Sequence, residues 1–183
     1  CLNKNLSAKI TLQPLKRFNL SAAIIFSDIL MVPYGLNQKI KFKKNFGPEL
    51  GSLNLEKISN VHETDFLNKL YPIYKSIKKV KENILTNNKD VIGFIGAPWT
   101  LLVYMINKHS PKKKLIRDFF KDDFLINRML IILEKFLKIH IEQQIKNGAT
   151  TIQIFDSWAG LLEEKYLPNY VYIPTLNLVN HVK

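Results

Sequence analysis

The chain is poor in cysteine, and none of its apolar runs is long enough to cross a membrane. Cys1 is the only cysteine among 183 residues, which excludes an internal disulfide and fits a reducing compartment. No apolar stretch approaches the roughly 20 residues that a transmembrane helix needs. The first residues also lack the charged and apolar segments of a signal peptide. These absences predict a cytoplasmic protein without a membrane partner.

Two kinds of binding motif are missing as well. Gly93 and Gly96 lie close together in the chain, but no third glycine completes a phosphate-binding loop. The four histidines are isolated from one another and from the cysteine, whereas zinc ligands occur at short, regular spacings. We therefore expect neither a nucleotide site nor a bound metal.

Arginine is scarce although the chain is basic, with a formal net charge of +12. Only Arg17, Arg117 and Arg128 are arginines; lysine supplies the rest of the excess. Such an excess can attract a polyanion, either nucleic acid or a small polycarboxylate, or it can reflect a compositional bias toward Lys, Asn and Ile. We favour the bias. The cluster at 112–114 has no interleaved aromatic residues, so we expect no nucleic acid partner.

Three short apolar runs, near residues 22–28, 91–96 and 151–156, each end in a polar tail. They are rich in Ile and Phe and alternate little with polar residues, which is typical of parallel strands buried on both faces. Reactive groups in such folds lie at the carboxyl ends of the strands. We therefore expect the three tails to converge on one site.

Helical periodicity fills the segments between these runs. It predicts a helix before the first strand and others near residues 72–86, 99–106, 124–146 and 162–182. Alternation at residues 39–43 predicts a small exposed strand. Strands that alternate with helices predict a parallel α/β fold. No linker or repeat interrupts the chain, so we expect residues 1–183 to form a single domain.

Each polar tail supplies candidate site residues, and each candidate has a structural alternative. Asp28 directly follows a strand, where its carboxylate can accept N–H bonds or stabilise a cation; alternatively, it is a turn or N-cap aspartate. Asp156 either pairs with Asp28 as an acid/base couple or holds the strand-end loop. Ser157 either donates to a ligand or caps the next helix. Tyr104 on its own is a core or rim tyrosine.

Longer strings around these residues resemble the uroporphyrinogen decarboxylase family. They are Thr-Leu-Gln-Pro-Leu-Lys-Arg-Phe at 11–18, Ala-Ala-Ile-Ile-Phe-Ser-Asp-Ile-Leu at 22–30, Ile-Gly-Phe-Ile-Gly-Ala-Pro-Trp-Thr-Leu at 92–101 and Gln-Ile-Phe-Asp-Ser-Trp-Ala-Gly at 153–160. The strings follow the family's order over nearly the whole chain. The resemblance implies the second to fourth strand units of a (β/α)8 TIM barrel. A whole barrel needs about 250 residues, so we expect a fragment.

The resemblance also implies a reaction. Family members remove CO2 from the acetate side chains of uroporphyrinogen III, without a cofactor, and give coproporphyrinogen III in heme biosynthesis. Asp28 matches the family's central aspartate, which is thought to bind the pyrrole N–H groups. Tyr104 and Ser157 match residues thought to contact substrate carboxylates, and Phe26 and Gly96 match positions that line the cleft. The family resemblance implies a homodimer for the full-length protein.

Departures from the family pattern leave two alternatives open. The family's arginine-bearing segment and late histidine are absent, and the sequence after Tyr104 lacks the usual glycine-rich loop. Lys108 or Lys112 could meet a carboxylate there, or could lie in a solvated loop. One alternative is a related barrel methyltransferase, cobalamin- or thiol-linked, although its zinc-binding His and Cys are not evident. The other is an inactive truncated fragment with exposed strand edges.

Overall fold

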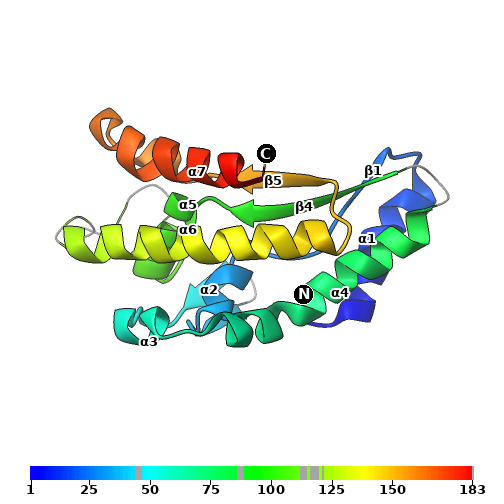
Figure 1. The fold of residues 1–183 in the computed structure, drawn as a ribbon, viewed down its shortest axis with the longest axis horizontal. Helices are drawn as coiled ribbons and strands as arrows, with labels where there is room; N and C mark the ends of the chain where they lie inside the picture. The colour runs from blue at the N-terminus through cyan, green and yellow to red at the C-terminus, as the bar shows by residue number, and fades with distance from the viewer. Residues whose placement is uncertain (44–46, 86–88, 112–114, 116–119, 121, 183) are drawn as a thin grey trace.

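A parallel sheet of three strands lies at the centre of the fold (Figure 1). In this computed structural model, the described residues are 1–43, 47–85, 89–111, 115, 120 and 122–182. The strands are β1 (Ala22–Ile24), β4 (Asp90–Gly96) and β5 (Thr151–Phe155), in the order β1-β4-β5. The three strands begin close to the predicted positions. β1 is shorter than the predicted strand at 22–28, because its pairing with β4 ends at Ile24.

Helices cover one face of the sheet and connect the strands. The α-helices of at least ten residues are α1 (Lys4–Arg17), α4 (Glu63–Ile84), α5 (Pro98–Asn107), α6 (Asp123–Lys146) and α7 (Ile173–Val182). Two short helices, α2 (Met31–Gly35) and α3 (Leu55–Ser59), lie in the long connection from β1 to α4. The predicted helices before the first strand, at 99–106 and at 124–146 are confirmed as α1, α5 and α6.

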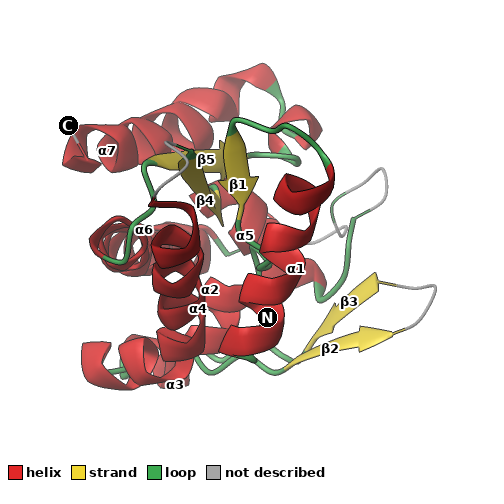
Figure 2. Cartoon of the chain, turned by 90° about the vertical axis from the view of Figure 1, so that its right-hand side faces the viewer, coloured by secondary structure: helices red, strands yellow, loops and turns green. Residues whose placement is uncertain are grey.

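The long connection after β1 also holds an antiparallel hairpin, which stands apart from the central sheet (Figure 2). Its strands are β2 (Ile40–Lys43) and β3 (Gly47–Leu50). The exposed strand predicted at 39–43 is therefore confirmed as β2, whereas its partner β3 was not predicted.

The helix predicted at 72–86 is longer at its amino end than the sequence indicated. α4 begins at Glu63 and contains Pro72. The buried apolar side of α4 extends toward its amino end through Phe66 and Leu70, which are both fully buried. Burial of these side chains outweighs the loss of the one backbone hydrogen bond that Pro72 removes from the helix.

The segment predicted as one helix at 162–182 changes its geometry along its length. A 3₁₀ turn (Glu164–Tyr166) and a π turn (Pro168–Tyr172) precede α7. Pro168 stands at the first position of the π turn, where a missing N–H costs no hydrogen bond. An earlier 3₁₀ turn (Ala159–Leu161) follows the tail of β5.

One face of the sheet is packed against helices, and the other is open. On the packed face, Ala23 and Ile25 are buried, as are Val91 and Ile95 of β4. On the open face, exposed fractions are 63% for Ile24, 44% for Phe26 and 42% for Phe155. The prediction that all three strands are buried on both faces is thus wrong for β1 and β5. Successive side chains of a strand point to opposite faces, and the described helices cover only one of them.

Two further features concern the predicted absence of a membrane span and the basic cluster. Among the described residues, no helix is both long and apolar enough to cross a membrane. The basic cluster at 112–114 lies outside the described residues.

Candidate functional site

The carboxyl ends of the three strands meet at one edge of the sheet. Gly96, the last residue of β4, pairs with Phe155, the last residue of β5. The next residue, Ala97, donates its N–H to the Phe155 carbonyl at 2.8 Å. On the other side, a Cβ placed on Gly96 would lie 3.2 Å from the Cβ of Ile29. The three polar tails therefore lie around Gly96.

Asp28 is half-buried and lies four residues after the end of β1, at the start of a tight turn. Its Oδ1 accepts the Leu30 N–H at 2.8 Å, and its carbonyl accepts the Met31 N–H at 3.2 Å. Among the described residues, Oδ2 has no hydrogen-bond partner. Burial raises the pKa of Asp28 above its ordinary value, and the hydrogen bond from Leu30 opposes this rise. The carboxylate is thus fixed through one oxygen, while the other can accept a donor or face a cation.

Asp156 is tied to helix α5. Its Oδ1 accepts the Thr100 hydroxyl at 2.7 Å, and the same Thr100 oxygen accepts the Trp158 N–H at 3.1 Å. Asp156 Oδ2 is buried without a partner among the described residues. Burial raises the pKa of Asp156, and the bonds from Thr100 oppose this. This geometry favours the loop-holding alternative for Asp156 over an acid/base couple with Asp28.

Phe26 presents its side chain to the open face while helix α1 holds its backbone. The Phe26 N–H donates to Thr11 Oγ1 at 2.8 Å, and the Phe26 carbonyl accepts from Ser7 Oγ at 2.7 Å. Ser76 of α4 donates in turn to Ser7 Oγ at 2.7 Å. The sequence analysis missed these three hydroxyls. Their spacing carries a weak signal, since Ser7 and Thr11 lie one helical turn apart on the buried face of α1.

Tyr104 and Ser157 differ in how firmly they are held. The ring of Tyr104 is half-buried and lies edge-on to Trp158, with 5.9 Å between ring centroids. Ser157 is exposed in the turn after β5 and caps no helix. Trp158 is anchored through its carbonyl, which accepts from Trp99 Nε1 at 3.0 Å. Tyr104 is thus packed against the Trp158 ring, whereas the side chain of Ser157 is exposed.

In the middle of β4, a side chain of α6 makes the backbone hydrogen bonds that a neighbouring strand would otherwise make. β1 leaves the sheet after Ile25, whose N–H donates to the Ile92 carbonyl at 3.0 Å. Beyond that point, the Phe94 N–H donates to Gln144 Oε1, and Gln144 Nε2 donates to the Phe94 carbonyl, both at 3.1 Å. A Cβ on Gly93 would collide with Gln144 Oε1. A side chain at position 93 would therefore displace the amide of Gln144, a residue of α6 that was also missed from the sequence.

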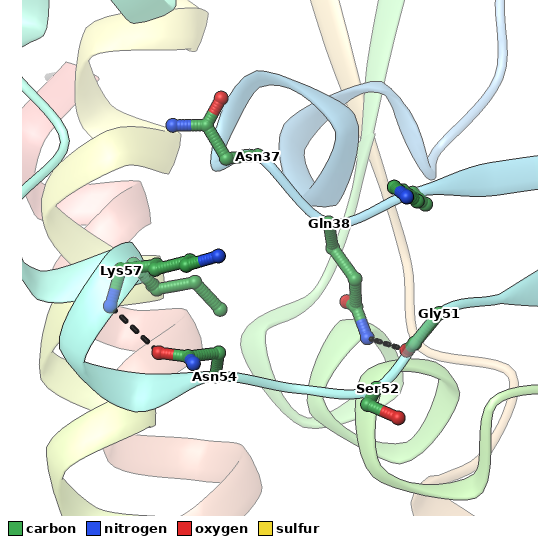
Figure 3. Close-up of a pocket in the computed structure, with 8 residues that line it drawn as sticks. Asn37, Gln38, Gly51, Ser52, Asn54 and Lys57 are labelled. Carbon is green, nitrogen blue, oxygen red and sulfur yellow. Dashed lines mark hydrogen bonds between the residues drawn. The ribbon is translucent and has the colours of Figure 1, made fainter.

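Hydrogen bonds hold the hairpin after β1 against the end of α5. Gln38 is 4% exposed, and its Nε2 donates to the carbonyls of Gly51 at 2.9 Å and Met105 at 3.0 Å. The Leu50 N–H also donates to the Lys108 carbonyl at 2.6 Å. Gln38 borders a polar pocket of about 310 Å3, lined by Asn37, Gln38, Lys39, Gly51, Ser52, Asn54, Lys57 and Ile58 (Figure 3). These bonds fix the segment that follows Tyr104 against the hairpin.

Lys108 and Lys112 are the two lysines that the sequence offered as possible carboxylate contacts after Tyr104. Lys108 is exposed and ends α5 with a φ of 64°. Lys112 lies outside the described residues. Within the part of the chain that the structure describes, no three His, Cys, Asp or Glu residues are grouped as metal ligands.

Comparison with solved structures identifies the class of fold. The chain resembles a methyltransferase from Methanosarcina mazei with a TM-score of 0.81, over 100% of this chain and 55% of that one. At 18% sequence identity, this likeness concerns the fold alone. Together with the parallel order β1-β4-β5, it confirms the predicted class, a partial (β/α)8 TIM barrel.

Sequence comparisons agree along the whole chain. Uroporphyrinogen decarboxylases from Agrobacterium fabrum, Rickettsia akari and Orientia tsutsugamushi are 34%, 37% and 38% identical to it. Each alignment covers 100% of this chain and 54% of the relative, so the chain spans about half the length of these curated relatives. A model of the family described as uroporphyrinogen decarboxylase (URO-D) matches residues 1–183. The chain therefore belongs to the uroporphyrinogen decarboxylase family.

Proposed function

We propose that the full-length protein removes CO2 from the acetate side chains of uroporphyrinogen III, giving coproporphyrinogen III without a cofactor. One observation carries the proposal: a half-buried carboxylate, Asp28, lies four residues beyond the end of β1 in a chain whose whole length matches the family. The relatives named above are decarboxylases, whereas the likeness to a methyltransferase is one of fold.

The reaction needs an electron sink, and a carboxylate can stabilise that sink. Protonation of a pyrrole carbon makes the ring cationic, and the electrons of the bond to the departing CO2 then flow into the ring. A proton then adds to the remaining methylene carbon to give the methyl group, and the ring carbon releases the proton that it had gained, so that the pyrrole is restored and one proton is taken up for each CO2 lost. In the proposal, Asp28 accepts the pyrrole N–H groups and faces the cationic ring. Its partial burial supports this role, because a charge pair is stronger where water is excluded.

The remaining site residues have supporting roles in the proposal. Tyr104 and Ser157 contact carboxylates of the substrate, and Phe26 and Gly96 form the wall of the cleft. The exposed ring of Phe26 supports this assignment, because a tetrapyrrole needs an apolar surface to lie on. The position of Gly96 supports its assignment as well, since it is the last residue of β4 and pairs with the last residue of β5. We also propose that the full-length protein is a cytoplasmic homodimer.

The test is Asp28→Asn in the full-length protein. Asparagine keeps an oxygen for the Leu30 N–H, so the fold persists while the charge is lost. We expect turnover of uroporphyrinogen to fall by about 10³-fold, because a preorganised charge at the reacting centre is removed. Asp90→Asn, at the exposed amino end of β4, is the matched control and retains activity. Wild-type turnover by Asp28→Asn would overturn the proposal.

We further propose that the 183-residue chain by itself forms one incomplete domain and is inactive. Support comes from its open sheet face, with Ile24, Phe26 and Phe155 exposed, since such apolar surface needs a cover in a stable protein. Gel filtration and a uroporphyrinogen assay on the isolated chain test this point. A compact monomer that turns over uroporphyrinogen would contradict it.

A further inference from the structure

Both polar groups of the Phe26 backbone bond to side chains of a helix. Thr11 Oγ1 accepts the Phe26 N–H, and Ser7 Oγ donates to the Phe26 carbonyl. Ser7 and Thr11 are 2% and 3% exposed, so water cannot easily take their place. An unpaired backbone group in such a setting destabilises the folded state, because no water replaces the lost hydrogen bond. Helix α1 therefore holds the chain at the point where it leaves β1.

A third hydroxyl fixes the direction of the bonds. Ser76 of α4 is fully buried, and its Oγ donates to Ser7 Oγ. A serine hydroxyl has one proton, and the Ser7 proton goes to the Phe26 carbonyl, so the Ser7 oxygen is left to accept from Ser76. The hydroxyls form a directed chain from α4 through α1 to the end of β1.

The anchored residue lies two positions before Asp28. Between Phe26 and α2 the chain makes one turn, closed by the Leu30 N–H on Asp28 Oδ1 and the Met31 N–H on the Asp28 carbonyl. These bonds join Asp28 to the short segment that begins at Phe26. The position of Phe26 therefore constrains the position of the Asp28 carboxylate.

We propose that Ser7, Thr11 and Ser76 are positioning residues for Asp28, because their buried hydroxyl chain fixes the end of β1. The proposal rests on the proposed function for its catalytic consequence. Its structural part, that the hydroxyls set the placement of Asp28, stands on the hydrogen bonds and burial alone. None of the three residues touches the reacting atoms, so each acts through Phe26.

The first experiment compares steady-state kinetics of full-length variants. Thr11→Val and Ser7→Ala each lower kcat by about tenfold and change KM by less than about twofold, because a misplaced carboxylate weakens the transition state more than substrate binding. Thr11→Ser keeps the hydroxyl and restores kcat. Tyr74→Phe removes a buried hydroxyl that bonds to His140, away from β1, and serves as the control for lost stability. If Asp28→Asn itself impairs turnover, unchanged kcat in Thr11→Val and Ser7→Ala would overturn the proposal.

The second experiment does not depend on turnover. Carbon-13 NMR titration of the full-length protein follows the carboxyl group of Asp28, whose pKa burial raises. Thr11→Val brings this pKa back toward the ordinary value of an aspartate, because the turn loosens toward water, whereas Thr11→Ser and Tyr74→Phe leave it in place. An unchanged Asp28 pKa in Thr11→Val would contradict the positioning role. If Asp28→Asn keeps full activity while Thr11→Val shifts this pKa, the proposed function fails and the positioning role survives.

Discussion

Thr100 holds Asp156 by a hydrogen bond of 2.7 Å from its hydroxyl to the carboxylate Oδ1. The same hydroxyl oxygen accepts the N–H of Trp158, so one side chain ties α5 to two residues of the tail after β5. Thr100 is fully buried. Helix α5 therefore anchors the segment that carries Ser157, as helix α1 anchors Phe26.

Thr100→Val is expected to destabilise the protein by about 3 kcal/mol, because it leaves a carboxylate oxygen and a backbone N–H without partners. Urea unfolding measures the loss. Thr100→Ser keeps the hydroxyl and is expected to remain within about 1 kcal/mol of wild type. A loss in Thr100→Ser without a loss in Thr100→Val would mean that the methyl group, and not the hydroxyl, stabilises this junction.

The difference between wild type and Thr100→Val is also expected to depend on pH. Burial raises the pKa of Asp156, and the Thr100 hydroxyl opposes this, so valine raises the pKa further. A carboxyl group whose pKa is higher in the folded state than in the unfolded state costs stability above its folded pKa. That cost disappears as pH falls below the unfolded pKa, about 3.9. The gap in unfolding free energy between the two proteins should thus be largest at neutral pH and narrow toward pH 4.

His140 supplies a second pH dependence, of opposite sign. It is buried between α6 and α4, where the Tyr74 hydroxyl lies 2.9 Å from its Nδ1 and the Phe66 ring lies edge-on to it. Burial lowers the pKa of His140 to about 4 and raises that of Tyr74. The neutral imidazole is favoured by folding, so its contribution is present above the unfolded pKa of about 6.5 and is lost as pH falls toward 4.

Between pH 7 and pH 5, this histidine is expected to cost the wild type about 2 kcal/mol of unfolding free energy. His140→Gln cannot protonate and is expected to lose correspondingly less over the same interval, although it is less stable at pH 7. Urea unfolding at the two pH values gives both numbers. Parallel losses in wild type and variant would show that His140 is not the group that titrates.

Periodicity and family strings predicted the strands and the long helices, and the reason is that both signals come from apolar residues. The residues that shape the site are polar and escaped this reasoning. Ser7 and Thr11 are 2% and 3% exposed on α1, and Gln144 is 1% exposed on α6, yet in a helix pattern each is typical of a solvated face. Their roles depend on backbone groups far away in sequence.

The open face of the sheet was missed for a related reason. Ile24 and Phe155 are apolar, which predicts burial, but whether a face is covered depends on which elements pack there. The tails of the strands were predicted to converge, and they do so around Gly96, because parallel strands place their carboxyl ends at one edge. The roles of Asp28, Tyr104 and Ser157 remain predictions.

Gln144 and Gly93 should behave as a coupled pair. Gln144→Leu leaves the N–H and carbonyl of Phe94 without partners and is expected to cost about 3 kcal/mol. Gly93→Ala drives a methyl group into Gln144 Oε1 and breaks the same bonds.

A double-mutant cycle by urea unfolding tests this coupling. With Gln144→Ala in place, the collision is removed, and Gly93→Ala is expected to cost at least about 1 kcal/mol less than in wild type. Part of its cost remains, because the added Cβ would also lie 3.0 Å from Ile152 Cδ1. Strict additivity would show that Gln144 does not restrict position 93.

Gly96→Ala is expected to impair both the site and the fold. The added Cβ would lie 2.7 Å from Leu101 Cδ2 and 3.2 Å from the Cβ of Ile29, so it pushes against α5 and against the turn that carries Asp28. Overpacking of this kind typically costs about 1–3 kcal/mol. Because the strain reaches Asp28, we expect kcat of the full-length protein to fall by about tenfold, as for other displaced catalytic groups.

Gly160→Ala is the matched control, since a Cβ there meets no atom of the described residues within 4 Å apart from its chain neighbours. It is expected to leave kcat unchanged and to alter stability by less than about 1 kcal/mol, through the unfolded chain alone. Steady-state kinetics and thermal unfolding on the two variants separate the effects. If Gly96→Ala lost stability but kept its kcat, the wall at Gly96 would support the fold without setting the position of Asp28.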